Sequence, residues 1–127
     1  MERAVNINGK EMRMRASALI PRLYRYKFGR DAIADMLSLK RAYDKAAALP
    51  DNATEEERRE AQFSALDLTI FENMAWLMLK HAGEEVGDSP DEWLDSIDGI
   101  FSIYEFLPEI IDLWQMNQAT TSKPRKK

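Results

Sequence analysis

The 127-residue chain contains no cysteine, a single histidine and no long apolar run. Without cysteine it has no disulfide, no thiolate nucleophile and no cysteine-based zinc site. Residues 74–79 form the longest nearly continuous apolar segment, which is far shorter than the roughly 20 residues that span a bilayer. Residues 1–15 also lack the apolar core of a secretory signal. These absences predict a cytoplasmic protein without a membrane span.

Motifs for catalysis and for cofactor binding are missing as well. The glycines are scattered singly, so the sequence offers no loop that would cradle a phosphate, and its carboxylates lack the spacing of a calcium site. His81 falls near the end of an expected helix, where a histidine is favourable for structural reasons alone. General acid–base chemistry would need a positioned partner, which the sequence does not predict. We therefore expect no enzymatic activity, no cofactor and no bound metal.

The composition is that of an ordinary globular domain, with 45% hydrophobic and 31% charged residues. A length of 127 residues suits one domain with a single core. The net charge of -4 is unevenly distributed, because the first quarter of the chain is basic and residues 84–112 are acidic. Poles of opposite sign favour oriented contacts with other proteins over binding along a polyanion.

The order of local signals predicts a mainly α fold in one domain over residues 1–117, with a β-hairpin over residues 1–15. Apolar and polar residues alternate on both sides of Asn8-Gly9, a dipeptide suited to a type I′ turn. In that register Val5 lies opposite Met12, and the hairpin gains one apolar face that must pack against something. Its open edge from Val5 to Ile7 is a candidate for self-association.

A bundle of about five helices is expected over residues 21–117. Pro21 and Gly29 bound the first helix, and Asp31 caps a second over residues 32–49, with Ile33 on its buried face. A third and central helix is expected from the capping box at Thr54 to about residue 81. The fourth starts at Ser89-Pro90, and the fifth is opened by Ser102 with Glu105 and kinked or restarted at Pro108.

The last helix carries more apolar surface than a single helical stripe needs. Phe106 and Trp114 fall on different faces of it, so we expect one of the two rings to meet another molecule. The candidate protein-binding residues are Tyr104, Phe106, Leu113 and Trp114, together with Val5 and Ile7 of the hairpin. Residues 118–127 are polar and basic and predict a flexible, disordered tail.

Several stretches taken in order resemble one family. They are "INGKE", "PRLYRYKFGRD", "FENMAWLMLKHA", "DEWLDSIDGIFSIYEFLPEIIDLW" and the closing "TTSKPRKK", and the most specific are "YRYKFGRD" in residues 24–31 and "IYEFLPEIIDLW" in residues 103–114. Together they resemble the small tail assembly chaperones of long-tailed bacteriophages and prophages of Gram-positive bacteria. The resemblance covers nearly the whole chain.

This resemblance implies a non-enzymatic factor of the host bacterial cytoplasm that coats the tape measure protein, self-associates along it and leaves before the virion is complete. It also implies that tail tube protein is recruited through a longer, frameshifted form, of which this chain would be the short, unshifted version. The alternative is a small helical DNA-binding regulator that uses the basic and aromatic residues 22–30. The acidic net charge favours the first interpretation, in which nucleic acid is not a partner.

Overall fold

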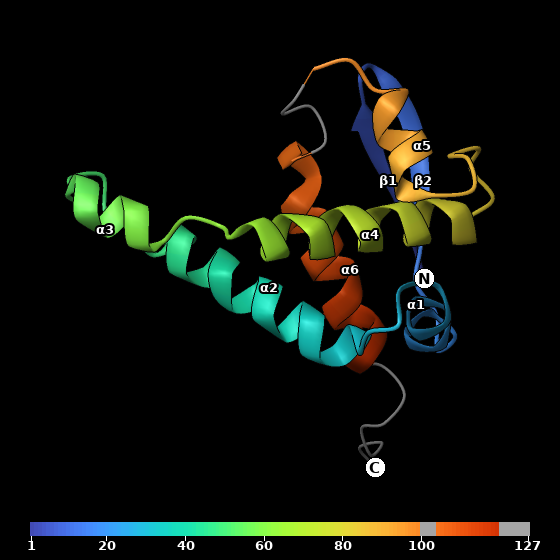
Figure 1. Cartoon of the computed structure of the whole chain (residues 1–127), viewed down its shortest axis with the longest axis horizontal. Helices are drawn as coiled ribbons and strands as arrows, with labels where there is room; N and C mark the ends of the chain where they lie inside the picture. The colour runs from blue at the N-terminus through green and yellow to red at the C-terminus, as the bar shows by residue number, and fades with distance from the viewer. Residues whose placement is uncertain (100–103, 120–127) are drawn as a thin grey trace, which may run out of the picture.

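A computed structural model describes residues 1–99 and 104–119 (Figure 1). The chain is mainly α-helical and starts with a two-stranded hairpin, as the sequence predicts. The elements in order are β1 (Glu2–Ile7), β2 (Lys10–Arg15), α1 (Ile20–Phe28), α2 (Ala32–Ala47), α3 (Glu55–Glu60), α4 (Ala65–His81), α5 (Pro90–Asp95), the short 3-10 helix η1 (Tyr104–Phe106) and α6 (Leu107–Ala119). Among the described residues no helix is long and apolar enough to cross a membrane.

The hairpin has the predicted register. Val5 pairs with Met12, and the φ angles of Asn8 and Gly9 are 55° and 80°, as a tight turn with two left-handed residues requires. The side chains of Val5 and Met12 are both buried, because the apolar face of the hairpin packs on α4 and α6. Burial of this face stabilises a two-stranded unit that would be marginal in water by itself.

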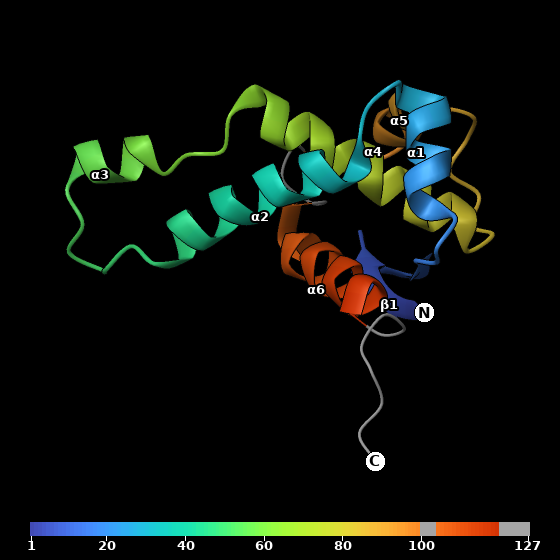
Figure 2. The same cartoon turned by 90° about the horizontal axis from the view of Figure 1, so that it is seen from below.

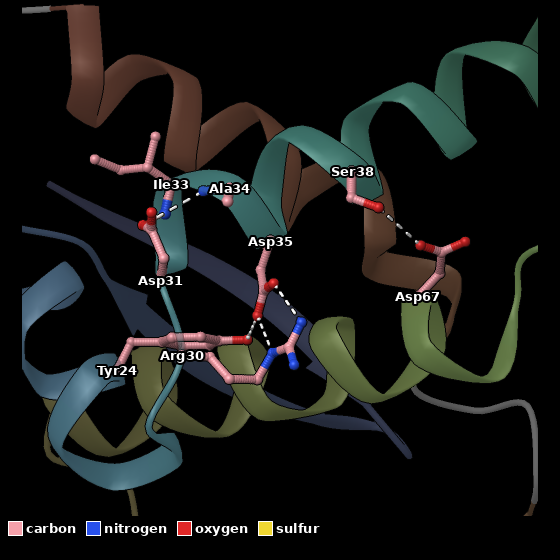
Figure 3. Close-up of polar contacts among 8 residues, drawn as sticks. All are labelled: Tyr24, Arg30, Asp31, Ile33, Ala34, Asp35, Ser38 and Asp67. Carbon is pink, nitrogen blue, oxygen red and sulfur yellow. Dashed lines mark hydrogen bonds and ion pairs between the residues drawn. The ribbon is translucent and has the colours of Figure 1, made fainter.

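The bounds of the first two helices follow their capping residues. Pro21 lies in the first turn of α1, and Gly29 ends that helix in a left-handed conformation with φ 66°. The Asp31 carboxylate caps α2 by accepting hydrogen bonds from the backbone N–H groups of Ile33 and Ala34 (Figure 3). α2 ends at Ala47, two residues earlier than expected.

The expected long third helix is wrong, because the chain forms two helices there. α3 begins at the predicted Thr54–Glu57 capping box, but a second box at Ser64 and Asp67 starts α4 afresh. Ser64 N donates to the Asp67 carboxylate at 3.0 Å, and Asp67 N donates to Ser64 Oγ at 3.0 Å. The described residues therefore form six α-helices, where about five were expected, and α3 lies at one end of the molecule in both views (Figures 1 and 2).

Helix α4 is the centre of the fold, as predicted. Nearly every side chain from residue 70 to residue 79 is buried on all sides of the helix. The hairpin, α1, α2, α5 and α6 all pack against α4, with α2 running alongside it and α6 crossing it (Figures 1 and 2). A helix that is apolar around its circumference has to be enclosed in this way.

The restart predicted at Pro108 is confirmed, because η1 gives way to α6 at Leu107 and Pro108 lies in the first turn of α6. Ser102, expected to cap this helix, lies outside the described residues. α6 continues to Ala119 and therefore includes the first two residues of the segment expected as a tail. Residues 120–127, the remainder of that basic segment, also lie outside the described residues.

A buried polar cluster joins α1 to α2 (Figure 3). The Tyr24 hydroxyl donates to Asp35 Oδ2 at 2.8 Å, and Arg30 donates from Nε to Oδ2 at 2.7 Å and from Nη2 to Oδ1 at 2.8 Å. The hydrogen bonds from Arg30 lower the pKa of the Asp35 carboxyl against the effect of its burial, and burial raises the pKa of Tyr24. All the hydrogen-bonding groups of this cluster therefore support a charged Asp35.

Replacing Asp35 by alanine should lower the free energy of unfolding by about 2–3 kcal/mol, because the buried Tyr24 hydroxyl loses its acceptor and Arg30 its bidentate partner. Urea unfolding measures this change. The matched control is Asp44→Ala, which removes an exposed ion pair with Lys40 on the same helix and should cost less than about 0.5 kcal/mol. Equal losses in the two variants would contradict this role of the cluster.

Candidate protein-binding surfaces

The aromatic and apolar residues expected to bind another protein through α6 are buried within the chain. Phe106, Leu113 and Trp114 are 4%, 1% and 5% exposed. The expectation that Phe106 or Trp114 projects towards another molecule is therefore wrong for the free chain. α6 packs on α4, on β1 and on α2, so the Phe106 and Trp114 rings are both covered although they lie on different faces of this segment. The Phe106 ring, for example, lies 5.5 Å from the Phe71 ring, measured between centroids.

Tyr104 is the one half-buried member of that set. Its hydroxyl donates to Glu72 Oε2 at 2.6 Å, and its ring lies 5.5 Å from the ring of Phe71. Burial and the neighbouring Glu72 carboxylate raise the pKa of Tyr104 to about 12. These contacts give Tyr104 a structural role that holds the turn before α6 against α4.

The hairpin residues expected to associate with another copy have buried side chains, since Val5 is 6% and Ile7 is 4% exposed. The backbone edges of the hairpin differ. On β2 the backbone N–H of Arg13 donates to the Glu84 carboxylate at 2.7 Å, which covers that edge. β1 has β2 as its only strand partner within the described chain, so its outer backbone edge is the side on which self-association remains a prediction.

The exposed large apolar residues identify other surfaces. They are Met1, Leu19, Tyr26, Ile33, Leu37, Leu66 and Met116. Ile33 and Leu37 are 53% and 49% exposed and lie one turn apart on α2. The expectation that Ile33 belongs to the core is wrong, because the core face of α2 is formed by Asp35, Met36 and Leu39 instead. Asp35 shares the inward face with Met36 and Leu39, whereas Ile33 and Leu37 lie on the outward face.

Ile33 and Leu37 border a hollow of about 150 Å³ between α2 and α6, which we call the α2/α6 groove. The other residues that line it are Met36, Lys40, Ile111, Trp114, Gln115 and Gln118. Trp114, although nearly buried, thus still contributes to a surface that another helix could cover. The lining carries one charge, that of Lys40, so the groove suits an apolar and largely uncharged partner segment.

A larger hollow of about 460 Å³ lies between α1 and α4, and we call it the α1/α4 groove. It is lined by Leu23, Tyr26, Lys27, Trp76, Leu77, Lys80 and His81. Its floor is apolar and the charged groups of its rim are cationic. The sequence predicts a basic first helix and an apolar central helix. It does not predict this groove, because the residues from α1 and from α4 are about 50 positions apart and meet only in the fold.

His81 has a serine partner that the sequence did not reveal. Ser17 Oγ and His81 Nε2 lie 2.9 Å apart and share a hydrogen bond, and Ser17 Oγ also accepts from Leu19 N at 3.2 Å. Burial lowers the pKa of His81, with smaller contributions from Arg15 and the N-terminal ammonium group. The charges that act on this ring are cations, whereas a catalytic histidine is usually oriented by a carboxylate. The pair therefore fits a structural role.

A chain with His81→Gln should show a weaker pH dependence of stability than the natural chain. Because the folded state lowers the pKa of His81, the unfolded chain binds the proton more readily, and the free energy of unfolding falls as the pH drops below the ordinary value of 6.5. Urea unfolding at pH 7.5 and at pH about 5 measures the difference. Equal slopes for the two chains would contradict the assigned environment.

Four basic residues in α1 and just after it carry the alternative of DNA binding. The guanidinium carbons of Arg22 and Arg25 lie 5.2 and 6.0 Å from the Tyr26 ring centroid, and both residues are exposed. Lys27 donates to the Asp88 carbonyl at 2.9 Å, and Arg30 pairs with Asp35. Half of this cationic set is therefore engaged within the chain.

Compared with protein-family models, with curated proteins and with solved structures, the chain gives no match. Within the described residues no group of three or more histidine, aspartate or glutamate side chains is placed to hold a metal ion.

Proposed function

We propose that this chain is a non-enzymatic tail assembly chaperone that binds the tape measure protein of a long-tailed phage or prophage in the host bacterial cytoplasm. The resemblance of its sequence motifs motivates the proposal. One structural observation supports it most, the pair of exposed apolar side chains Ile33 and Leu37 beside the α2/α6 groove. An apolar, mostly uncharged groove between two helices suits the apolar stripe of a client helix.

The geometry suggests how the client is held. A client helix laid along α2 would cover Ile33 and Leu37 and contact the exposed edge of Trp114. A hollow of about 150 Å³ buries little area, so one chain binds weakly and many copies along a long client bind together through avidity. Weak single contacts also permit release before the virion is finished. Self-association through the β1 edge and recruitment of tail tube protein through a frameshifted form remain parts of the proposal.

The double variant Ile33→Asp/Leu37→Asp should weaken binding to a tape measure fragment by about tenfold or more, which corresponds to at least about 1.4 kcal/mol. The reason is that a client helix would have to desolvate two carboxylates in an apolar contact. The measurement is co-purification of the co-expressed fragment, followed by titration of the purified chain with it.

Ala34→Asp is the control for the effect of each added carboxylate, because it places one aspartate at an exposed position of the same helix that does not line the groove. This variant should bind within about twofold of the natural chain, since a surface charge away from the contact has little effect. An unchanged affinity of the double variant for the tape measure fragment would contradict the assignment of the α2/α6 groove as the client site. Absence of any binding by the natural chain would sink the proposed function itself.

The alternative function is a DNA-binding regulator, favoured by the surface cations Arg22 and Arg25 on α1. A gel shift with duplex DNA at physiological salt separates the two. A chaperone gives no shift, whereas specific retardation that Arg22→Ala/Arg25→Ala abolishes would transfer the assignment to the regulator. Arg30 is unsuitable for this test because it belongs to the buried cluster with Asp35.

A further inference from the structure

The α1/α4 groove differs from the α2/α6 groove in the charge of its rim. Its floor is made by Leu23 of α1 and by Trp76 and Leu77 of α4, and the Tyr26 side chain stands beside it 67% exposed. A hollow of about 460 Å³ is large enough for one or two bulky apolar side chains of a partner. The groove therefore has the apolar floor of a docking site.

Two ammonium groups stand over this floor. The Nζ atoms of Lys27 and Lys80 lie 5.3 and 5.7 Å from the Trp76 ring centroid. They also donate to the carbonyls of Asp88 and Gly87, at 2.9 and 3.1 Å, and Trp76 Nε1 donates to the neighbouring Val86 carbonyl at 3.2 Å. The loop that supplies these carbonyls thus fixes both cations at the groove and leaves further N–H donors on each ammonium group.

The charge at the groove has one sign. None of its lining residues is an aspartate or glutamate, and Arg22 and Arg25 add two cations around the exposed Tyr26 ring. Outside this lining, the Asp88 carboxylate pairs with Lys80 at 3.8 Å from a side chain that is 96% exposed. An exposed pair of this kind contributes little and yields to a better acceptor.

We propose that the α1/α4 groove is a second docking site, which takes an acidic amphipathic helix of a partner protein. The apolar stripe of this helix lies on Leu23 and the exposed Tyr26 ring, above the nearly buried Trp76 and Leu77. Its flanking carboxylates accept hydrogen bonds from Lys27 and Lys80. Charge complementarity selects this occupant. The cationic rim repels a basic helix, and an uncharged helix such as the client expected at the α2/α6 groove offers no acceptor for the two ammonium groups. The assignment stands whether or not the client is a tape measure protein.

The test uses the full-length chain and synthetic helical peptides of about 15 residues, long enough to form a helix on binding. The probe has leucine at positions i, i+3, i+4 and i+7 with glutamate at the flanking positions, and its control has lysine in place of every glutamate. Fluorescence anisotropy of the labelled peptides gives Kd. The glutamate peptide should bind at least tenfold more tightly than the lysine peptide, and the difference should shrink at about 0.5 M salt.

Two variants locate the site. Lys27→Gln/Lys80→Gln should raise the Kd of the glutamate peptide at least tenfold, and so should Tyr26→Glu, which leaves the loop contacts of both lysines in place. Lys45→Gln, an exposed lysine on α2, is the control and should change Kd by less than twofold. Because the lysines also hold the loop, thermal unfolding of each variant is compared with that of the natural chain, and Tyr26→Glu decides the outcome if the lysine variant unfolds early.

Three results would overturn the proposal. The first is equal affinity for the two peptides, or no measurable binding of either. The second is a Kd for the glutamate peptide that Tyr26→Glu leaves unchanged. The third is a different occupant, shown by a short DNA duplex that displaces the peptide more effectively than unlabelled peptide does, or by self-association of the chain that Tyr26→Glu abolishes. None of these results depends on the tape measure assay, so the two proposals fail separately.

Discussion

The fold depends on the burial of α4, a helix that is apolar around most of its circumference between residues 70 and 79. Each large apolar side chain removed from water contributes about 1.5–3 kcal/mol, so enclosing this one helix outweighs any surface interaction in the molecule. Five other elements use their apolar faces to enclose it. The two grooves proposed as binding sites lie along this enclosure, one where α1 packs on α4 and the other where α2 meets α6.

The α2/α6 groove and the α1/α4 groove differ in the charge of the residues that surround them. The cluster of Tyr24, Arg30 and Asp35 joins α1 to the buried face of α2. Ile33 and Leu37 lie outside this face, beside a groove whose lining carries one charge. At the α1/α4 groove, the loop after α4 holds the ammonium groups of Lys27 and Lys80 over an apolar floor. The two proposed sites together would hold an apolar helix and an acidic one at once, as an assembly factor that brings components together requires.

Local signals in the sequence predicted most elements, because each is encoded within a few residues. Asn8-Gly9 fixed the hairpin register, and Ser89-Pro90 and Pro108 marked helix starts where the structure has them. Ser64 and Asp67 also have the spacing of a capping box, but the apolar residues on both sides of it favour a continuous helix. The surfaces were less predictable, since periodicity alone did not reveal that a buried Asp35 sets the face of α2 or that α6 is covered on two sides. Phe106 and Trp114 therefore looked exposed, although both are nearly buried in the free chain and only Trp114 lines a groove.

Hydrogen exchange of the chain, alone and saturated with a tape measure fragment, shows whether the client binds at the α2/α6 groove while the core stays closed. The account predicts slower exchange in the first half of α2 and in the second half of α6, with the slow exchange of α4 unchanged. Faster exchange in α4 or α6 on binding would mean that the core opens to expose Phe106 and Trp114. That result would contradict the account.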